Sequence, residues 1–251
     1  SQLRLIAIPD RPGSGARVDI NMRRLGVCSI MSLERPGAET LEIAHVLFMD
    51  VVGYSRLPMD TQATAMRRLI EVLRSSQAFQ NAETSDRLLR LPTGDGFALV
   101  FSGSPEEPVR CALEVSRALR ADPFIHLRMG VHTGPIYRVP DINANRNVSG
   151  GGIIVAQRVM DCGDQGHILV SNAVAEILVQ LSDWQGNLHD LGDTEVKHGF
   201  RLRLYNLHTE DAGNPAVPAK LHNAAVTTQT ERRLGMAPRW IGLAALFFLA
   251  A

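Results

Sequence analysis

The stretch that decides the fold is residues 45–55, which read HVLFMDVVGYS. Its apolar run contains several β-branched side chains, and only Asp50 interrupts it. A short apolar run that ends at turn residues is typical of a strand buried within a sheet. We therefore predict a buried strand over residues 45–52, with Asp50 near its end and a turn at Gly53-Tyr54-Ser55.

The next patterned stretches predict a helix and a hairpin. Residues 60–77 carry apolar side chains at helical spacing. Residues 87–101 read RLLRLPTGDGFALVF, in which two strand-like runs flank the turn residues Pro92 to Gly96. Such a sequence is typical of a β-hairpin.

The remaining pattern continues the alternation of helices and strands. Strand, helix, hairpin, helix and strand follow one another, which is the order of a ferredoxin-like palm sheet. The expected fold class is α/β, more narrowly α+β, with helices flanking the sheet. We predict helices over 106–121, 153–161 and 172–181, strands over 125–132, 135–139, 167–171, 188–191 and 201–207, and a polar loop over 141–149.

Two aspartates lie where a palm sheet would bring them together. Asp50 is near the end of the first strand, and Asp95 is in the hairpin turn. Paired carboxylates repel each other unless a cation neutralises them, and their oxygens suit Mg²⁺ or Mn²⁺. We therefore predict a metal site, and we expect asparagine at either position to relieve repulsion in the metal-free protein. Taken alone, Asp95 has a second interpretation as a turn former before glycine.

Composition excludes several other classes of protein. The 251 residues include 26 basic and 26 acidic side chains, so no net charge attracts nucleic acid or an anionic membrane over the whole molecule. An apolar fraction of 45% is enough for a core and excludes a disordered or collagen-like chain. Three widely spaced cysteines fit neither a disulfide framework nor a C-x-x-C zinc site, which favours a reducing cytoplasm.

The two ends of the chain differ from the domain predicted over residues 42–208. Residues 1–41 predict a tail or linker, and residues 209–238 predict a second linker. Residues 239–251 are apolar after their first arginine, but spanning a bilayer takes about 20 residues. This segment is therefore either a short buried or interfacial helix or the start of a membrane anchor. In the second case we expect the domain on the cytoplasmic face of the inner membrane.

Four motifs follow one another along the predicted domain. They are FMDVVGYS at 48–55, TGDGF at 93–97, GVHTGP at 130–135 and AQR at 156–158. Together they resemble the signatures of a class III nucleotidyl cyclase catalytic domain of the bacterial type. The resemblance implies the nucleotide cyclase fold, and conversion of ATP or GTP to the 3′,5′-cyclic monophosphate and pyrophosphate in cyclic-nucleotide signalling. It also implies two Mg²⁺ or Mn²⁺ ions at sites shared across a homodimer. The balanced charge of the chain argues against a nucleic acid partner.

The resemblance assigns the metal ions and the phosphates to the first motif and the hairpin turn. It implies that Asp50, Val51 and Asp95 hold the ions. The turn after Asp50 also offers backbone N–H groups close to the start of a helix, which suits the terminal phosphates of the nucleotide. The residues of this turn are Val52, Gly53, Tyr54 and Ser55.

Two cationic side chains complete the implied site. Phosphoryl transfer builds up charge on the equatorial oxygens, which a fixed guanidinium stabilises, and by family position this group is Arg158. Its alternative interpretation is an exposed helix arginine paired with Asp161. Lys197 falls where the family carries a phosphate-binding lysine, and its alternative is a solvated lysine at the start of a strand.

Three positions depart from the family pattern. Leu91 stands where adenylyl cyclases carry a base-selecting lysine and guanylyl cyclases a glutamate. Asn147 stands at the second base-selecting position, where it is either a base contact or part of a polar loop. Ile154 stands in place of a ribose-orienting asparagine, on the same helix face as Arg158. ATP or GTP is favoured as substrate, and a pyrimidine triphosphate also stays open.

A second class of function stays open beside catalysis. Leu91 and Ile154 favour a cyclase-like regulatory or dimerisation module with little or no turnover, whereas Asp50, Asp95 and Arg158 favour the enzyme. Another palm-type nucleotidyl transferase is a weaker alternative, because the chain lacks the G-G-D/E-E-F signature of diguanylate cyclases.

Overall fold

The computed structural model describes residues 40–140, 146–196 and 199–221. The predicted tail up to residue 39, Lys197 and the apolar segment 239–251 lie outside these residues. Among the helices within them, none is both long and apolar enough to cross a membrane.

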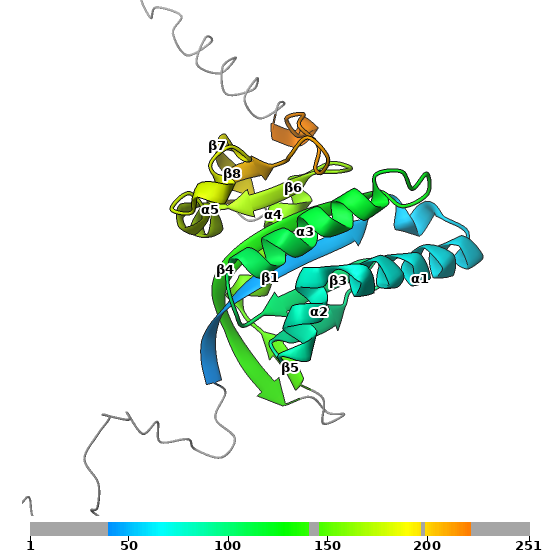
Figure 1. Ribbon diagram of the computed structural model, residues 1–251, viewed down its shortest axis with the longest axis horizontal. Helices are drawn as coiled ribbons and strands as arrows, with labels where there is room; N and C mark the ends of the chain where they lie inside the picture. The colour runs from blue at the N-terminus through cyan, green and yellow to red at the C-terminus, as the bar shows by residue number, and fades with distance from the viewer. Residues whose placement is uncertain (1–39, 141–145, 197–198, 222–251) are drawn as a thin grey trace, which may run out of the picture. The chain divides into compact units, whose positions relative to one another are not determined.

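Within the described residues, one sheet of eight strands organises the chain (Figure 1). Its order is β2-β3-β1-β4-β6-β8-β7, with β5 paired to β4 off this path. Strands β4 and β6 run parallel, and the other paired strands are antiparallel. The strands are β1 Thr40–Val51, β2 Leu88–Pro92, β3 Gly96–Phe101, β4 Leu127–Pro140, β5 Arg146–Ser149, β6 Ile168–Ser171, β7 Leu188–Val196 and β8 Phe200–Leu207.

Helices cover both faces of the sheet (Figure 1). Leu47 and Met49 of β1 face a core shared with α1, α2, α3 and α5, while Val46 and Phe48 face a second core under α4. The apolar run of β1 is continuous because both of its faces are buried. The helices are α1 Met59–Ser75, α2 Gln77–Thr84, α3 Glu106–Leu119, α4 Gly151–Asp161 and α5 Asn172–Leu178, with short 3-10 turns η1 Tyr54–Arg56 and η2 Ser182–Trp184.

This topology confirms the α/β class and the ferredoxin-like palm sheet. The palm is the four-strand unit β2-β3-β1-β4. Along the chain, α1 follows β1 and α3 precedes β4. The predicted hairpin is confirmed as β2 and β3, with Gly94 in the left-handed region at φ 95° in the turn between them. Strand β1 begins at Thr40, earlier than the predicted His45.

The two strands predicted around Thr133-Gly134 are one continuous strand, β4. Thr133 pairs with His45 and Gly134 with Ala44, so the glycine is not in a turn. A Cβ atom on Gly134 would lie 3.2 Å from the Cα atom of Gly152 in α4. Gly134 therefore serves the close approach of helix and strand, which sequence periodicity does not distinguish from a turn.

Two elements were not predicted. Residues 146–149 of the predicted polar loop form β5, which pairs with the far end of β4. The predicted helix over 60–77 ends at Ser75, and α2 begins at Gln77. Ser76 separates the two helices because its Oγ accepts the Phe79 N–H at 3.2 Å and donates to Glu114 at 2.6 Å.

Residues 209–221, which the sequence assigns to a linker, pack against the domain. Ala212 and Leu221 are buried. His167 is buried, and its Nε2 atom lies 2.8 Å from the carbonyl oxygen of Ala216. The N–H of Asp164 donates a hydrogen bond to Nδ1 of the same ring.

Candidate active site

The end of β1 and the β2–β3 turn meet, which brings Asp50 and Asp95 to one place. Asp50 lies opposite Gly96 in the β1–β3 pair, and the Val51 N–H donates to the Asp95 carbonyl at 2.9 Å. A Cβ atom on Gly96 would lie 2.0 Å from the Met49 carbonyl oxygen, so only glycine allows this contact. Asp50 is 6% exposed and Asp95 is half-buried.

The Asp50 carboxylate is held by a side chain that the sequence analysis did not single out. Arg128 of β4 lies directly opposite Asp50 and donates from Nε to Oδ1 at 2.8 Å and from Nη2 to Oδ2 at 2.7 Å. The same Nη2 lies 3.3 Å from a carboxylate oxygen of Asp161, at the end of α4. The hydrogen bonding that Arg128 donates to Asp50 is the main reason why the pKa of Arg128 is raised, which keeps the guanidinium charged.

This pairing corrects the expectation that asparagine at position 50 would relieve repulsion. Asp50 already has a cation, so loss of its charge would remove an attraction. The signal that could have found Arg128 is its position in the sequence. It is a charged residue inside an apolar strand, and buried charges require partners. The identity of that partner depends on the register between β1 and β4, which no local pattern contains.

The turn after β1 differs in one respect from the predicted phosphate cradle. Gly53 has φ 77° and precedes the 3-10 turn η1. The Val52 N–H donates to the His126 carbonyl at 2.8 Å, so it is already used within the protein. The N–H groups of Gly53, Tyr54 and Ser55 open η1, where helix geometry supplies no acceptors.

Helix α4 presents Ile154 and Arg158 away from the aspartates. The Arg158 guanidinium lies 5.8 Å from the centre of the Phe200 ring in β8. Among the described residues, no ion pair is found for Arg158, and the carboxylate of Asp161 contacts Arg128. Ile154 is 50% exposed. One chain therefore does not bring Arg158 to Asp50 and Asp95.

The predicted base-contacting positions are only partly described. Leu91 lies in β2 opposite Ala98 and packs against the core under α4, on the same face of the sheet as Asp50. Asn147 is in β5 opposite Val139, and its side chain lies outside the described part of the structure, as does all of Lys197.

The donor set at the aspartates fits a divalent cation. Within the described ranges, no group of three or more His, Cys, Asp or Glu side chains gathers as a metal cluster. Asp50 and Asp95 nevertheless offer carboxylate oxygens, the ligands that Mg²⁺ and Mn²⁺ prefer. The guanidinium of Arg128 acts as a stand-in cation on Asp50, which shows that this carboxylate is placed to hold positive charge.

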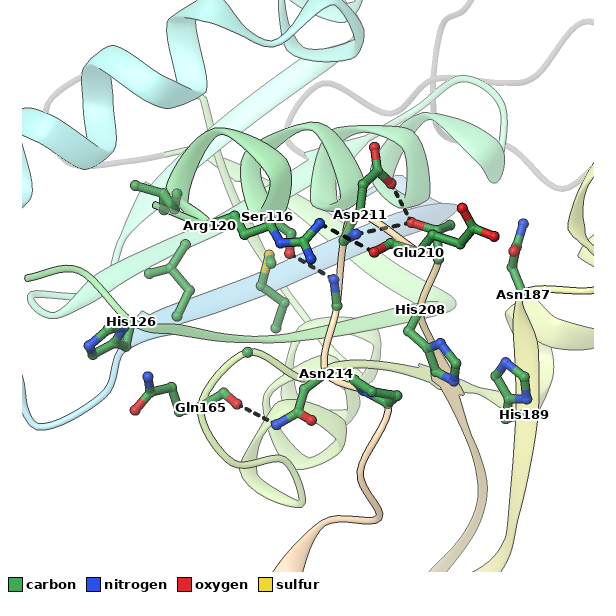
Figure 2. Close-up of a pocket in the computed structure, with 18 of the residues that line it drawn as sticks. Ser116, Arg120, His126, Gln165, Asn187, His189, His208, Glu210, Asp211 and Asn214 are labelled. Atoms are coloured by element: carbon green, nitrogen blue, oxygen red, sulfur yellow. Dashed lines mark hydrogen bonds between the residues drawn. The ribbon is translucent and has the colours of Figure 1, made fainter. Parts of the chain in front are cut away.

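A cleft of about 800 Å³ lies elsewhere on the chain (Figure 2). Segment 208–215, the end of α3 and the start of β4 line it, and the stacked rings of His189 and His208 stand 4.0 Å apart on its wall. Leu127 and Met129 form part of the lining. Because their side chains belong to the core under α1–α3, the cleft and the Asp50 carboxylate lie on opposite faces of β4.

Comparison with known proteins supports the palm assignment. The family model for the adenylate and guanylate cyclase catalytic domain matches residues 37–209. Over 198 residues the chain is 27% identical to atrial natriuretic peptide receptor 2 from Mus musculus, covering 72% of this chain and 18% of that receptor. The chain thus spans about a fifth of the curated relative.

Solved structures share the fold. The guanylate cyclase domain of RhGC from Catenaria anguillulae, in complex with GTP, is 19% identical with a TM-score of 0.55, covering 70% of this chain and 100% of that one. An adenylate/guanylate cyclase/hydrolase from Silicibacter pomeroyi is 24% identical with a TM-score of 0.54, covering 69% and 100%.

Proposed function

The chain belongs to the adenylate and guanylate cyclase catalytic domain family, and from this membership we propose that residues 42–208 catalyse nucleotide cyclisation. The substrate is a nucleoside triphosphate, with ATP or GTP favoured. The products are the 3′,5′-cyclic monophosphate and pyrophosphate. In the reaction a bond forms between the ribose 3′-oxygen and the α-phosphorus, the bond from that phosphorus to the β-phosphate oxygen breaks, and the 3′-hydroxyl proton leaves.

The observation that carries this proposal is the adjacency of Asp50 and Asp95, together with the ion pair between Asp50 and a cationic group. The β1–β3 register, in which Asp50 lies opposite Gly96, supports the proposal, and so does the ion pair between Asp50 and Arg128. Cyclisation needs positive charge near both the attacking oxygen and the leaving pyrophosphate. The carboxylates of Asp50 and Asp95 can hold the cations that supply this positive charge.

We propose that Asp50, Asp95 and the backbone of Val51 hold two Mg²⁺ or Mn²⁺ ions. When bound, such ions lower the pKa of the 3′-hydroxyl and neutralise the pyrophosphate. The protein itself supplies the remaining contacts. The N–H groups of Gly53 to Ser55 would bind the terminal phosphates. Arg128 keeps one guanidinium beside the aspartates, and Arg158 would supply a second toward the triphosphate.

The second guanidinium requires a second chain. Arg158 contacts Phe200 and lies away from the aspartates of its own chain. Ile154 and Phe200 are exposed apolar side chains near it, at 50% and 45%. We propose a homodimer in which α4 of one chain faces Asp50 and Asp95 of its partner, so that each site takes residues from both chains.

The choice of base depends on positions 91 and 147. Leu91 is apolar and partly buried, so it offers neither the lysine nor the glutamate that the family uses for adenine or guanine. The resemblance places Asn147, with an amide that both donates and accepts, at the second base position. ATP and GTP are therefore both proposed, and a pyrimidine triphosphate is tested with them.

One observation favours the alternative of a weakly active or inactive regulatory module. Ile154 presents an exposed apolar side chain where a hydrogen bond to the ribose is expected. A module of this kind would bind nucleotide and dimerise with little or no turnover.

The deciding experiment incubates purified protein with each of the four nucleoside triphosphates and Mn²⁺, and measures cyclic nucleotide. Asp50→Asn and Asp95→Asn should abolish the product, whereas Asp193→Asn, at an exposed site in β7, should not. Product that survives in either aspartate variant contradicts the metal assignment. If the protein binds nucleotide but forms no cyclic product from any of the four triphosphates, the result supports the regulatory module.

A further inference from the structure

Arg128 stands between two carboxylates that come from different elements. Its Nη2 lies 2.7 Å from Asp50 Oδ2 in β1 and 3.3 Å from Asp161 Oδ1 at the end of α4. Side-chain exposure is 24% for Arg128, 9% for Asp50 and 20% for Asp161, so solvent screens these contacts only in part. One guanidinium nitrogen is thus shared between the two acids.

Arg128 occupies both oxygens of Asp50. The two parallel hydrogen bonds, at 2.8 and 2.7 Å, form the bidentate pairing that fits a carboxylate best. A divalent cation that takes Asp50 as a ligand needs these same oxygens. Arg128 therefore competes with a metal ion for Asp50, and an ion that takes the lone pairs used by the guanidinium displaces it.

The cost of that release depends on where the guanidinium goes. A charged group that loses its partner in a partly buried site is destabilised, because nothing replaces the lost hydrogen bonds. Asp161 is already within ion-pair distance of Nη2, so Arg128 can leave Asp50 and keep a carboxylate partner. This keeps the positive charge inside the site.

We propose that Asp161 is a positioning residue that receives Arg128 when a divalent cation displaces it from Asp50. The inference rests on the proposed function, because it assumes that Asp50 is a metal ligand. It adds that metal affinity at Asp50 is set by competition with Arg128, and that Asp161 moderates this competition. Neither side chain needs to touch the metal for this effect.

The test measures Mn²⁺ binding to the whole chain without nucleotide, by calorimetry and by the electron paramagnetic resonance signal of free Mn²⁺. Arg128→Met removes the competitor and should tighten Mn²⁺ binding about three- to tenfold. Asp161→Asn removes the second partner and should weaken it by a similar factor. Arg128→Lys keeps one ion pair and should lie between wild type and Arg128→Met. Asp190→Asn, which breaks the exposed Arg203–Asp190 pair, should leave the affinity unchanged.

The double variant separates positioning from a general charge effect. In an Arg128→Met background, Asp161→Asn should change Mn²⁺ affinity less than about twofold, because no guanidinium remains to be received. An undiminished effect in that background overturns the proposal, since Asp161 would then act on the metal directly. Unchanged affinity in Arg128→Met overturns it as well.

These outcomes are distinguishable from failure of the proposed function. Wild-type protein that binds Mn²⁺ and forms cyclic nucleotide, but shows additive effects of the two substitutions, refutes only the role of Asp161. Wild-type protein that binds no Mn²⁺ refutes both. Thermal melting of each variant confirms that the fold is retained, and Arg128→Lys carries the test if Arg128→Met unfolds.

Discussion

A Cβ atom on Gly130 of β4 would lie 2.3 Å from the backbone nitrogen of Met160 in α4. It would also lie 2.7 Å from the Ala156 carbonyl oxygen. The backbones of strand and helix are therefore in direct contact. Because Arg128 lies two residues before Gly130 and Asp161 directly follows Met160, this contact also sets the distance between those two side chains.

Gly130→Ala should therefore disturb both stability and the site. The new methyl group meets backbone atoms that cannot rotate away, so α4 must shift, at a cost of about 1–3 kcal/mol in the free energy of unfolding. We expect loss of cyclisation beyond what the loss of stability explains. Gly186→Ala is the matched control, because its Cβ atom has nothing within 4 Å and its backbone is not in the left-handed region. Urea unfolding and product formation measure both effects, and a Gly130→Ala protein as stable as Gly186→Ala contradicts the close contact.

Substitutions of Asp50 and of Asp95, the two proposed metal ligands, should differ in their effect on stability. Asp50→Asn breaks the bidentate pair with Arg128 and should lower the free energy of unfolding by about 1–3 kcal/mol. Asp95 forms no ion pair among the described residues. Asp95→Asn should therefore change the free energy of unfolding by less than about 0.5 kcal/mol. Both variants should lose cyclisation. Equal melting temperatures for the two would show that the Arg128 pair contributes little in solution.

The adjacency of Asp50 and Asp95 could be predicted because it follows from local patterns. A buried strand, a helix and a hairpin admit few arrangements, and the palm order places the strand end next to the hairpin turn. The metal site expected from the charge of the two aspartates stays a prediction, and the cation found on Asp50 is Arg128.

Arg128 and β5 could not be predicted in the same way. The partner of Arg128 depends on the register of β1 against β4, with Asp50 and Arg128 separated by 78 residues. Strand β5 has the polar sequence Arg-Asn-Val-Ser, and its strand conformation comes from pairing with β4 and not from propensity. Both are consequences of long-range pairing, which short-range periodicity does not contain.

Mixed chains test whether the site is shared. Asp50→Asn and Arg158→Ala chains should each be inactive alone, and an equal mixture should recover about a quarter of wild-type activity. Half of randomly assorted dimers are mixed, and each mixed dimer keeps one of its two sites intact. A mixture of Asp50→Asn with Asp95→Asn is the matched control and should recover nothing, because every site then lacks one aspartate. Equal recovery in both mixtures, or none in the first despite proven mixed dimers, contradicts a shared site.

His132 should make stability depend on pH. Its Nδ1 lies 2.8 Å from Ser171 Oγ, and burial lowers the pKa of the ring to about 4 from an unfolded value of about 6.5. Between these values the unfolded chain binds more protons than the folded chain, so stability rises with pH. The contribution of the neutral His132 ring to the free energy of unfolding is fully present above about pH 6.5. It is lost as the pH falls toward 4, and the total loss is about 1–3 kcal/mol.

His132→Gln isolates this effect from the carboxylates that titrate in the same range. The free energy of unfolding of wild type minus that of the variant should fall as the pH is lowered from 7 to 4.5. Urea unfolding at several pH values measures it. A difference that stays constant over this range would mean that the folded ring titrates like the unfolded one.

Ile154→Asn tests the departure from the family pattern at the ribose position. Ile154 is 50% exposed on α4, so the substitution should change the free energy of unfolding by less than about 0.5 kcal/mol. If the amide hydrogen-bonds the ribose, it holds the 3′-hydroxyl in line with the α-phosphorus. One such bond is worth about 0.5–1.5 kcal/mol, which corresponds to about a twofold to tenfold gain in rate.

The gain should appear in kcat and leave KM nearly unchanged, because the triphosphate contacts dominate nucleotide binding in both proteins. Val179→Asn is the matched control, since Val179 is a similarly exposed apolar residue at 43%, at the end of α5. A rise in KM with constant kcat would place Ile154 in ground-state binding instead. An unchanged or lower kcat would mean that another residue orients the sugar, with Asn147 the first to test. Inactivity of both wild type and Ile154→Asn with every nucleotide would favour the regulatory module, because restoring the missing amide would then not restore the reaction.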